Sequence, residues 1–303
     1  MAKDLVIGAV SDYTFDKIEP WLNSLQRSGY NGNVAIVAYN MSAETVNRLS
    51  NRGIQYIFGF ERDAFGNFVY NNKAFSIMIE RFIHMWYFIK DMQEDTDYVI
   101  TTDVRDVVFQ TNPSTWLRGM SEQKSIFVAT ENLLYEQEPW GRNNLLNSFG
   151  ELMYDHLKNR PIYCAGVIAG KKQAMLDLFL NVFLLSKSAP AHVVGGGGPD
   201  QAALNITIGL EQFAKTIGFM CPENDFALHA GTTLEAIKSG SGEIGATYLR
   251  DPSVLDTYAQ NLLFAEPIMK DGLVCNKDGQ PYCIVHQYDR VNSWRDLIDR
   301  KYR

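Results

Sequence analysis

The stretch Tyr98-Val-Ile-Thr-Thr-Asp-Val-Arg-Asp-Val-Val-Phe109 decides the expected fold. Its first five residues are aromatic, apolar or β-branched, which is typical of a strand buried on both faces of a sheet. Three charged residues, Asp103, Arg105 and Asp106, then interrupt the apolar pattern before it resumes. Charged groups at the end of a core strand need partners, because burying an unpaired charge is strongly unfavourable.

Arg105 can neutralise only one of the two carboxylates of Asp103 and Asp106. A divalent cation with oxygen ligands would balance the other, and hard cations such as Mn²⁺ and Mg²⁺ favour carboxylates. The alternative is a solvated turn with a local Asp–Arg pair, since loops at strand ends are polar in any case. Motifs elsewhere in the chain are needed to choose between these two interpretations.

The composition is that of an ordinary globular protein, with 303 residues, 46% hydrophobic and 21% charged. This length allows one large α/β domain or two small ones. The net charge of −7 and the absence of a Lys/Arg run argue against nucleic-acid binding. An anionic substrate would therefore need a metal ion or a few well-placed cations.

The four cysteines show no C-x-x-C spacing, so the sequence indicates neither a zinc site nor a disulfide scaffold. The N-terminus enters a short apolar strand directly and lacks the longer apolar core of a secretory signal. No apolar run approaches the roughly 20 residues that cross a bilayer. We therefore expect a cytoplasmic protein without a transmembrane segment.

Apolar runs typical of buried strands alternate with helical patterns in the first 130 residues. Such alternation predicts a Rossmann-like, mostly parallel sheet flanked by helices, built by right-handed crossovers. Ligands bind at the carboxyl ends of the strands in such sheets, which is where Asp103 and Asp106 lie. The strands are expected at residues 5–10, 34–39, 54–58, 98–102 and 125–130, and the helices between them include 42–51 and 74–92.

The later part of the chain is less regular. A strand over 162–170 contains Gly166, a sign that backbone or ligand approaches closely. The loop over 131–144 is polar and aromatic, so its Trp and Tyr side chains either stack on a sugar or pack beneath the loop. In the tail, 219–303, the clear elements are a strand over 282–286 and a helix over 294–302.

A run of four glycines, 195–198, precedes a helix that has Asp200 and Gln201 in its first turn. The run matches neither the G-x-G-x-x-G fingerprint nor a phosphate-binding loop. A flexible hinge beside a helix that begins with a carboxylate is typical of a lid. A simple linker is the other interpretation.

Four segments, in chain order, resemble motifs of the metal-dependent glycosyltransferases with the GT-A fold. They are Thr102-Asp-Val-Arg-Asp106 for the acidic D-x-D motif, Cys164-Ala-Gly-Val167 for N-[AS]-G-V, Asp200-Gln-Ala-Ala-Leu-Asn205 for D-Q-x-x-[LF]-N, and His286 for the late histidine. Two departures stand out: the acids are spaced D-x-x-D, and Cys164 replaces the usual Asn. Either Asp106 or Arg105 therefore takes the second place of the acidic motif.

The resemblance implies a single GT-A domain over 1–303, with a nucleotide-binding half at 1–130 and an acceptor-binding half at 131–303. It implies Mn²⁺ or Mg²⁺ on Asp103, Asp106 and His286. Residues at the ends of the first two strands would contact the nucleotide, and further polar residues the rest of the donor. These are Ala9, Val10, Asp12 and Tyr39 for the nucleotide, and Arg81, Asp103, Arg105 and Gln201 for the donor.

The implied function is transfer of a sugar from a nucleotide-diphosphate donor to a glycan or other hydroxyl acceptor, as in polysaccharide biosynthesis. Asp200 is the candidate catalytic residue, as a general base in an inverting enzyme or as a donor-sugar contact in a retaining one. Because Gln201 and Asn205 accompany it, we favour a retaining enzyme. The structural alternative is an acid that the helix dipole favours at a helix start.

Two other function classes remain open. A nucleotidyltransferase that makes nucleotide sugars would also use an acidic metal site, but it would normally carry cations just after the first strand, where Gly8-Ala-Val-Ser-Asp-Tyr13 has none. A non-catalytic carbohydrate-binding protein would need the aromatic loop but no metal. Metal-dependent turnover of a nucleotide sugar would separate the three.

Overall fold

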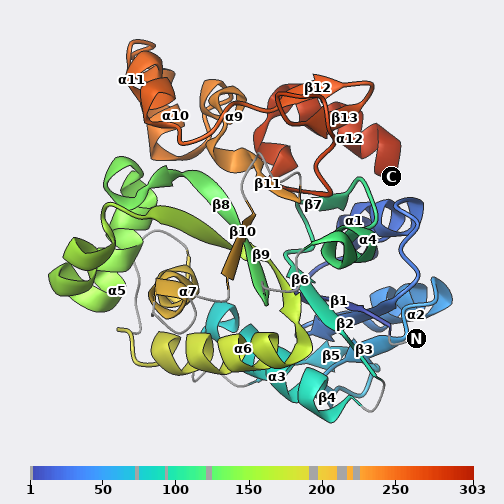
Figure 1. The fold of residues 1–303 in the computed structure, drawn as a ribbon. Coiled ribbons are helices and arrows are strands. Elements are labelled where there is room, and N and C mark those ends of the chain that lie inside the picture. The colour runs from blue at the N-terminus through green and yellow to red at the C-terminus, as the bar shows by residue number, and fades with distance from the viewer. Residues whose placement is uncertain are drawn as a thin grey trace.

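The computed structural model describes residues 3–71, 75–92, 95–120, 125–190, 197–209, 217–220 and 226–303. A seven-stranded sheet lies at its centre, in the order β10-β8-β9-β6-β1-β2-β3 (Figure 1). The strands span Leu5–Val10 (β1), Asn33–Ala38 (β2), Tyr56–Phe58 (β3), Tyr98–Thr102 (β6), Ile126–Leu134 (β8), Pro161–Lys171 (β9) and Ile217–Met220 (β10).

The expected mostly parallel sheet is confirmed. β1 pairs in parallel with β2 and with β6, β2 with β3, and β10 with β8. The exception is β9, which runs antiparallel between β6 and β8. Both expected halves contribute strands to this one sheet, and β8 itself crosses residue 130. The chain is thus a single α/β domain, and the division of labour between 1–130 and 131–303 stays a prediction.

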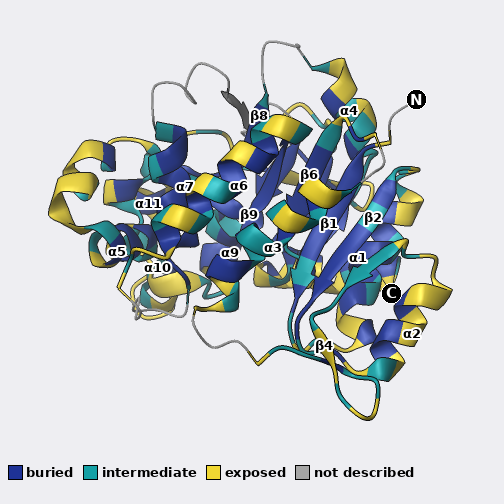
Figure 2. Cartoon of the chain, turned by 90° about the horizontal axis from the view of Figure 1, so that it is seen from below, coloured by how far each residue is buried: buried dark blue, intermediate teal, exposed yellow. Residues whose placement is uncertain are grey.

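Two layers of helices cover the sheet because its strands are apolar on both faces (Figures 1 and 2). Along β1, for example, Val6 packs in one core and Ile7 in the other. The first core is closed by α1 (Phe15–Arg27), α2 (Ala43–Asn51) and α4 (Pro113–Gly119). The second is closed by α3 (Ile77–Asp91), α6 (Lys172–Ser186) and α7 (Asp200–Gly209).

A second, three-stranded sheet connects the middle of the chain to its C-terminal part. Its central strand β14 (Ile284–His286) pairs in parallel with β11 (Ala227–His229) and antiparallel with β7 (Val107–Phe109). Residues 103–106, between β6 and β7, form the acidic turn that contains Asp103 and Asp106. Since β7 begins directly after Asp106, this sheet brings the C-terminal part of the chain to that turn.

The expected loop over 131–144 is wrong in most of its length. β8 continues to Leu134, a 3-10 turn follows, and α5 (Pro139–Leu157) begins earlier than expected. The physical reason is a helix start that polar composition concealed: Pro139 is in the first turn, and the Glu138 side chain accepts from the backbone N–H groups of Trp140 and Gly141. Tyr135 is buried, so it packs beneath this segment.

The tail contains more regular structure than expected. Besides β14 and α12 (Asn292–Tyr302), it holds β11 and several short elements. A short hairpin, whose two strands have two residues each, also occupies part of the expected loop over 59–72. These elements are α9 (Leu234–Lys238), α10 (Gly242–Tyr248), α11 (Val254–Asn261), β12 (Ile268–Lys270), β13 (Leu273–Cys275), and the hairpin strands β4 (Glu61–Arg62) and β5 (Phe68–Val69).

Half of the glycine run, residues 195 and 196, lies outside the described residues, so the expected lid stays a prediction. In the part of the chain that is described, no helix combines the length and the apolar character needed to cross a membrane.

Candidate functional site

Two carboxylates and one imidazole meet at the carboxyl end of β6. His286 Nε2 lies 3.4 Å from Asp103 Oδ2 and 3.9 Å from Asp106 Oδ1. One potential ligand atom from each of the three residues lies within 4.8 Å of the others. The structure therefore brings together the three residues that the sequence predicts as metal ligands.

Strand pairing explains how a histidine 180 residues downstream reaches the acidic turn. β14 pairs with β7 so that His286 is opposite Val107, the residue after Asp106. The backbone N–H of Gln287 then donates to Asp106 O at 2.7 Å. On the other side of the turn, Asp103 N donates to Gly166 O of β9 at 2.8 Å. The backbone of all three segments is thus fixed before any ligand binds.

Gly166 leaves the space that the His286 ring fills. A Cβ atom at position 166 would overlap Cε1 of that ring. Only glycine is therefore compatible with this position of His286. The close approach at this glycine is made by a side chain, whereas the sequence led us to expect backbone or a ligand.

The three side chains fit a divalent cation. His286 Nε2 is buried and has no hydrogen-bond partner among the described residues, although it faces two carboxylates. Arg105 donates to Asp106 Oδ2 at 2.9 Å, which leaves Asp106 Oδ1 on the histidine side. Of the two candidates for the second place of the acidic motif, Asp106 is thus the one with an oxygen on the histidine side, and its place in the motif stays a prediction. Asp103 is the most accessible of the three, with 36% of its side chain accessible, so a cation would enter from its side.

Arg81 of α3 joins the acidic turn to α7. Its Nη1 donates to Asp103 Oδ1 and its Nη2 to Asp200 Oδ2, both at 2.7 Å. All three side chains are largely buried or half-buried. A planar guanidinium can hold two carboxylates at once with this geometry, which a lysine cannot.

No protein-family model matches this chain. No curated protein matches it either. Among solved structures it is similar to WbbM, a bifunctional glycosyltransferase, with a TM-score of 0.56 and 13% identity over 98% of this chain and 49% of that one. It therefore spans about half the length of that neighbour.

The galactosyltransferase LgtC, solved in complex with donor and acceptor sugar analogs, is similar over nearly its whole length. The TM-score is 0.53 at 12% identity, over 98% of this chain and 96% of that one. The chain has the GT-A fold. Because a fold hosts many functions, activity has to be argued from the site.

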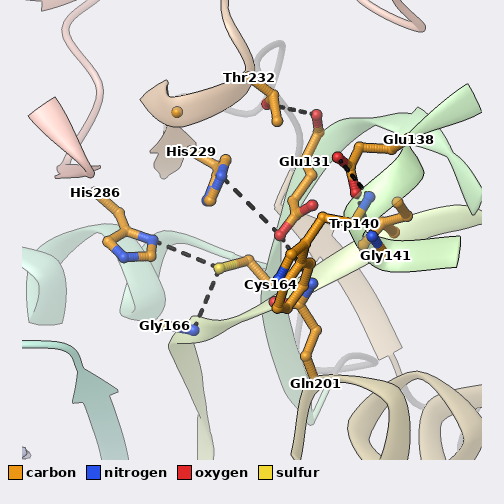
Figure 3. Close-up of polar contacts among 12 residues, drawn as sticks. Glu131, Glu138, Trp140, Gly141, Cys164, Gly166, Gln201, His229, Thr232 and His286 are labelled. Atoms are coloured by element: carbon orange, nitrogen blue, oxygen red, sulfur yellow. Dashed lines mark hydrogen bonds and ion pairs between the residues drawn. The ribbon is translucent and has the colours of Figure 1, made fainter. Parts of the chain in front are cut away.

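In this GT-A fold, α7 carries the D-Q segment onto β9. Asn205 accepts from Tyr163 N at 2.9 Å and donates to Tyr163 O at 2.7 Å, which pins the helix to the strand. Gln201 then points inward: its Nε2 donates to Glu131 Oε1 at 2.9 Å (Figure 3). Asp200 and Gln201 consequently face different partners, the first Arg81 and the second Glu131.

The expected nucleotide contacts lie at the ends of β1 and β2, beside the acidic turn of the GT-A fold. Ala9 is half-buried, Val10 is buried and Asp12 is exposed. Tyr39 is fully buried, and its hydroxyl lies 2.9 Å from His84 Nδ1. Its side chain therefore presents no surface to a ligand in this structure.

Electrostatics distinguish the groups at the site. Burial alone would raise the pKa of Asp103, but Arg81 and His286 hold it well below its usual range. Burial opposes the charged form of His286, yet the Cys164 sulfur and the Asp103 and Asp106 carboxylates raise its pKa well above normal. Asp103 is therefore ionised across the physiological pH range and available to a cation.

Sequence reasoning missed Glu131, Tyr13 and His229. Glu131 is buried, and burial together with the nearby Glu138 carboxylate raises its pKa to about 8. Burial raises the pKa of Tyr13 also, and the charges of Arg105 and Asp103 act on it. The available signal was position: Glu131 and Tyr13 follow the expected ends of two central strands, as Asp103 does. His229 had no such signal, because its short strand was not expected.

Proposed function

We propose that this chain is a metal-dependent glycosyltransferase that uses a nucleotide-sugar donor. The observation that carries the proposal is the buried His286 Nε2, which has no hydrogen-bond partner among the described residues and lies 3.4 Å and 3.9 Å from carboxylate oxygens of Asp103 and Asp106. Their oxygen and nitrogen ligands suit Mn²⁺ or Mg²⁺. When bound there, the cation would stabilise the negative charge that develops on a departing nucleoside diphosphate. The GT-A fold supports this use of the site.

The remaining residues would bind and orient the donor. Ala9, Val10 and Asp12, at the end of the strand next to β6, are our proposed contacts of the nucleotide. Arg81 holds Asp103 in place and, through its second amino group, sets the position of Asp200. Arg105 fixes the rotamer of Asp106 by binding the oxygen that faces away from His286.

A retaining outcome is the stereochemistry we favour. A general base has to offer a free oxygen within about 3 Å of the acceptor hydroxyl. Asp200 is buried, and Arg81 occupies its Oδ2. Such a carboxylate suits contact with the donor sugar better than proton transfer from an acceptor.

The test incubates the purified chain with a panel of nucleotide sugars and glycan acceptors, with Mn²⁺ or with a chelator. Release of nucleoside diphosphate that requires the metal supports the proposal, and NMR of the product assigns its anomeric configuration. Metal-dependent release of pyrophosphate from a nucleoside triphosphate and a sugar phosphate would instead indicate a nucleotidyltransferase. Sugar binding without turnover of any donor would indicate a carbohydrate-binding protein.

A further inference from the structure

A cysteine and a second histidine, Cys164 and His229, lie beside His286 (Figure 3). Cys164 Sγ is 3.5 Å from His286 Nδ1, and the His229 and His286 rings are 5.1 Å apart in an edge-to-face arrangement. One ligand atom from each of these three residues lies within 4.8 Å of the other two. All three residues are buried.

The strands position this cluster without help from a ligand. His229 and His286 are opposite each other in the parallel pair β11 and β14. Cys164 comes from β9, where the Gly166 N–H donates to its sulfur at 3.3 Å. His229 Nδ1 is buried and has no hydrogen-bond partner among the described residues. Binding of a metal ion by this nitrogen would therefore break no hydrogen bond.

We propose that Cys164, His229 and His286 form a second metal site, which takes a softer cation such as Zn²⁺. Thiolate and imidazole select Zn²⁺ over Mn²⁺ and Mg²⁺. With bonds of about 2.3 Å to sulfur and 2.0–2.1 Å to nitrogen, a tetrahedral zinc ion holds its ligand atoms about 3.3–3.6 Å apart. The Sγ–Nδ1 pair already has this separation, so a small movement of His229 completes the three-ligand set. The fourth position is left for water.

The shared histidine couples this site to the carboxylates, a consequence that rests on the proposed function. A neutral imidazole has one nitrogen with a free lone pair and one that carries hydrogen. Zinc on His286 Nδ1 leaves hydrogen on Nε2, which then cannot be a ligand of a cation at Asp103 and Asp106. Zinc should therefore weaken Mn²⁺ binding, and Mn²⁺ should weaken zinc binding by the same factor.

The test uses Co²⁺ as a spectroscopic stand-in for Zn²⁺, because a cobalt–thiolate bond produces a charge-transfer absorption that carboxylate ligands do not. We expect this absorption on adding Co²⁺ to the protein, and its loss on adding Zn²⁺. The band should be absent in Cys164→Ser and Cys164→Ala, and the Co²⁺ affinity should fall at least about tenfold in His229→Asn. Cys275→Ser, which changes a buried cysteine of β13, should leave both unchanged.

Circular dichroism of each variant shows whether it is folded, and either Cys164 variant suffices. An absent band in the folded wild-type protein, or a band that persists in a folded Cys164 variant, would overturn the zinc site. If the band forms but Mn²⁺ shows no binding at the carboxylates, the zinc site stands and the proposed function fails. If both bind but Zn²⁺ leaves the apparent Kd of Mn²⁺ unchanged, the shared histidine does not couple them.

Discussion

Arg81 Nη2 donates to Asp200 Oδ2 at 2.7 Å, although 119 residues separate them in the chain. The contact fixes the start of α7 relative to α3. Because Arg81 binds Asp103 with its other amino group, the same side chain couples the D-Q segment to the acidic turn. A buried carboxylate left without this guanidinium would be strongly destabilised.

Replacing Arg81 with lysine should separate Asp200 from Asp103. Lysine keeps the charge but has one nitrogen in place of the two amino groups that hold Asp103 and Asp200, so the two carboxylates cannot both keep their present positions. Displacement of a donor-positioning group by about 1 Å costs on the order of 100-fold in turnover. We expect this loss for Arg81→Lys in the donor-hydrolysis or transfer assay. Arg48→Lys, which alters an exposed pair with Asp16, is the matched control and should keep wild-type turnover.

Gly166→Ala tests whether the backbone of β9 sets the position of His286. The added Cβ would overlap the imidazole ring, so the ring has to leave the carboxylates. Overpacking of this kind costs about 1–3 kcal/mol in the free energy of unfolding. The Mn²⁺ affinity should fall by at least about tenfold.

Gly119→Ala is the control for this substitution, because nothing lies within 4 Å of an added Cβ at that position. Its metal affinity should equal that of the wild-type protein in calorimetry. An unchanged affinity in Gly166→Ala would mean that His286 does not need the space above this glycine.

The raised pKa of Glu131 predicts that the stability of the protein depends on pH. Its carboxyl has a pKa of about 8 in the folded protein, largely because of burial, against about 4.3 in an unfolded chain. At pH values between these two pKa values, the Glu131 carboxyl keeps its proton in the folded protein but has lost it in the unfolded chain. The free energy of unfolding should therefore fall as the pH rises from about 4.5 through 8.

Glu131→Gln removes this titration and should flatten the dependence. Thermal melts from pH 5 to pH 8 should show the wild-type Tm falling more steeply than that of the variant. The exposed Glu136→Gln is the control, and its curve should follow the wild-type one. Parallel curves for wild-type protein and Glu131→Gln would show that Glu131 titrates normally.

The sheet could be predicted because its information is local. Runs such as residues 5–10 and 98–102 carry apolar side chains on both faces, and the helices between them require parallel pairing. The antiparallel direction of β9 was not visible in the same way, since it depends on where the chain returns after α5. The start of α5 was hidden because Glu138 and Pro139 act as a helix cap while they look like a polar loop.

The meeting of Asp103, Asp106 and His286 could be predicted from residue types and from the resemblance, whereas its surroundings could not. Asp103 and Asp106 follow a core strand, and His286 was found through the resemblance. The contacts of Arg81 with Asp200 and of Cys164 with His286 join positions more than 100 residues apart. Such contacts follow from tertiary packing, and no spacing in the sequence encodes them.

Binding of Mn²⁺ measured by calorimetry, with and without a nucleoside diphosphate, tests the central claim most directly. We predict one Mn²⁺ per chain in the wild-type protein, and binding weaker by at least about tenfold in Asp106→Asn. The melt of that variant should stay close to wild type. Asp155→Asn, an exposed acid on α5, should bind Mn²⁺ as the wild-type protein does. Undiminished Mn²⁺ binding in folded Asp106→Asn would contradict the account, because the cation would then lie elsewhere.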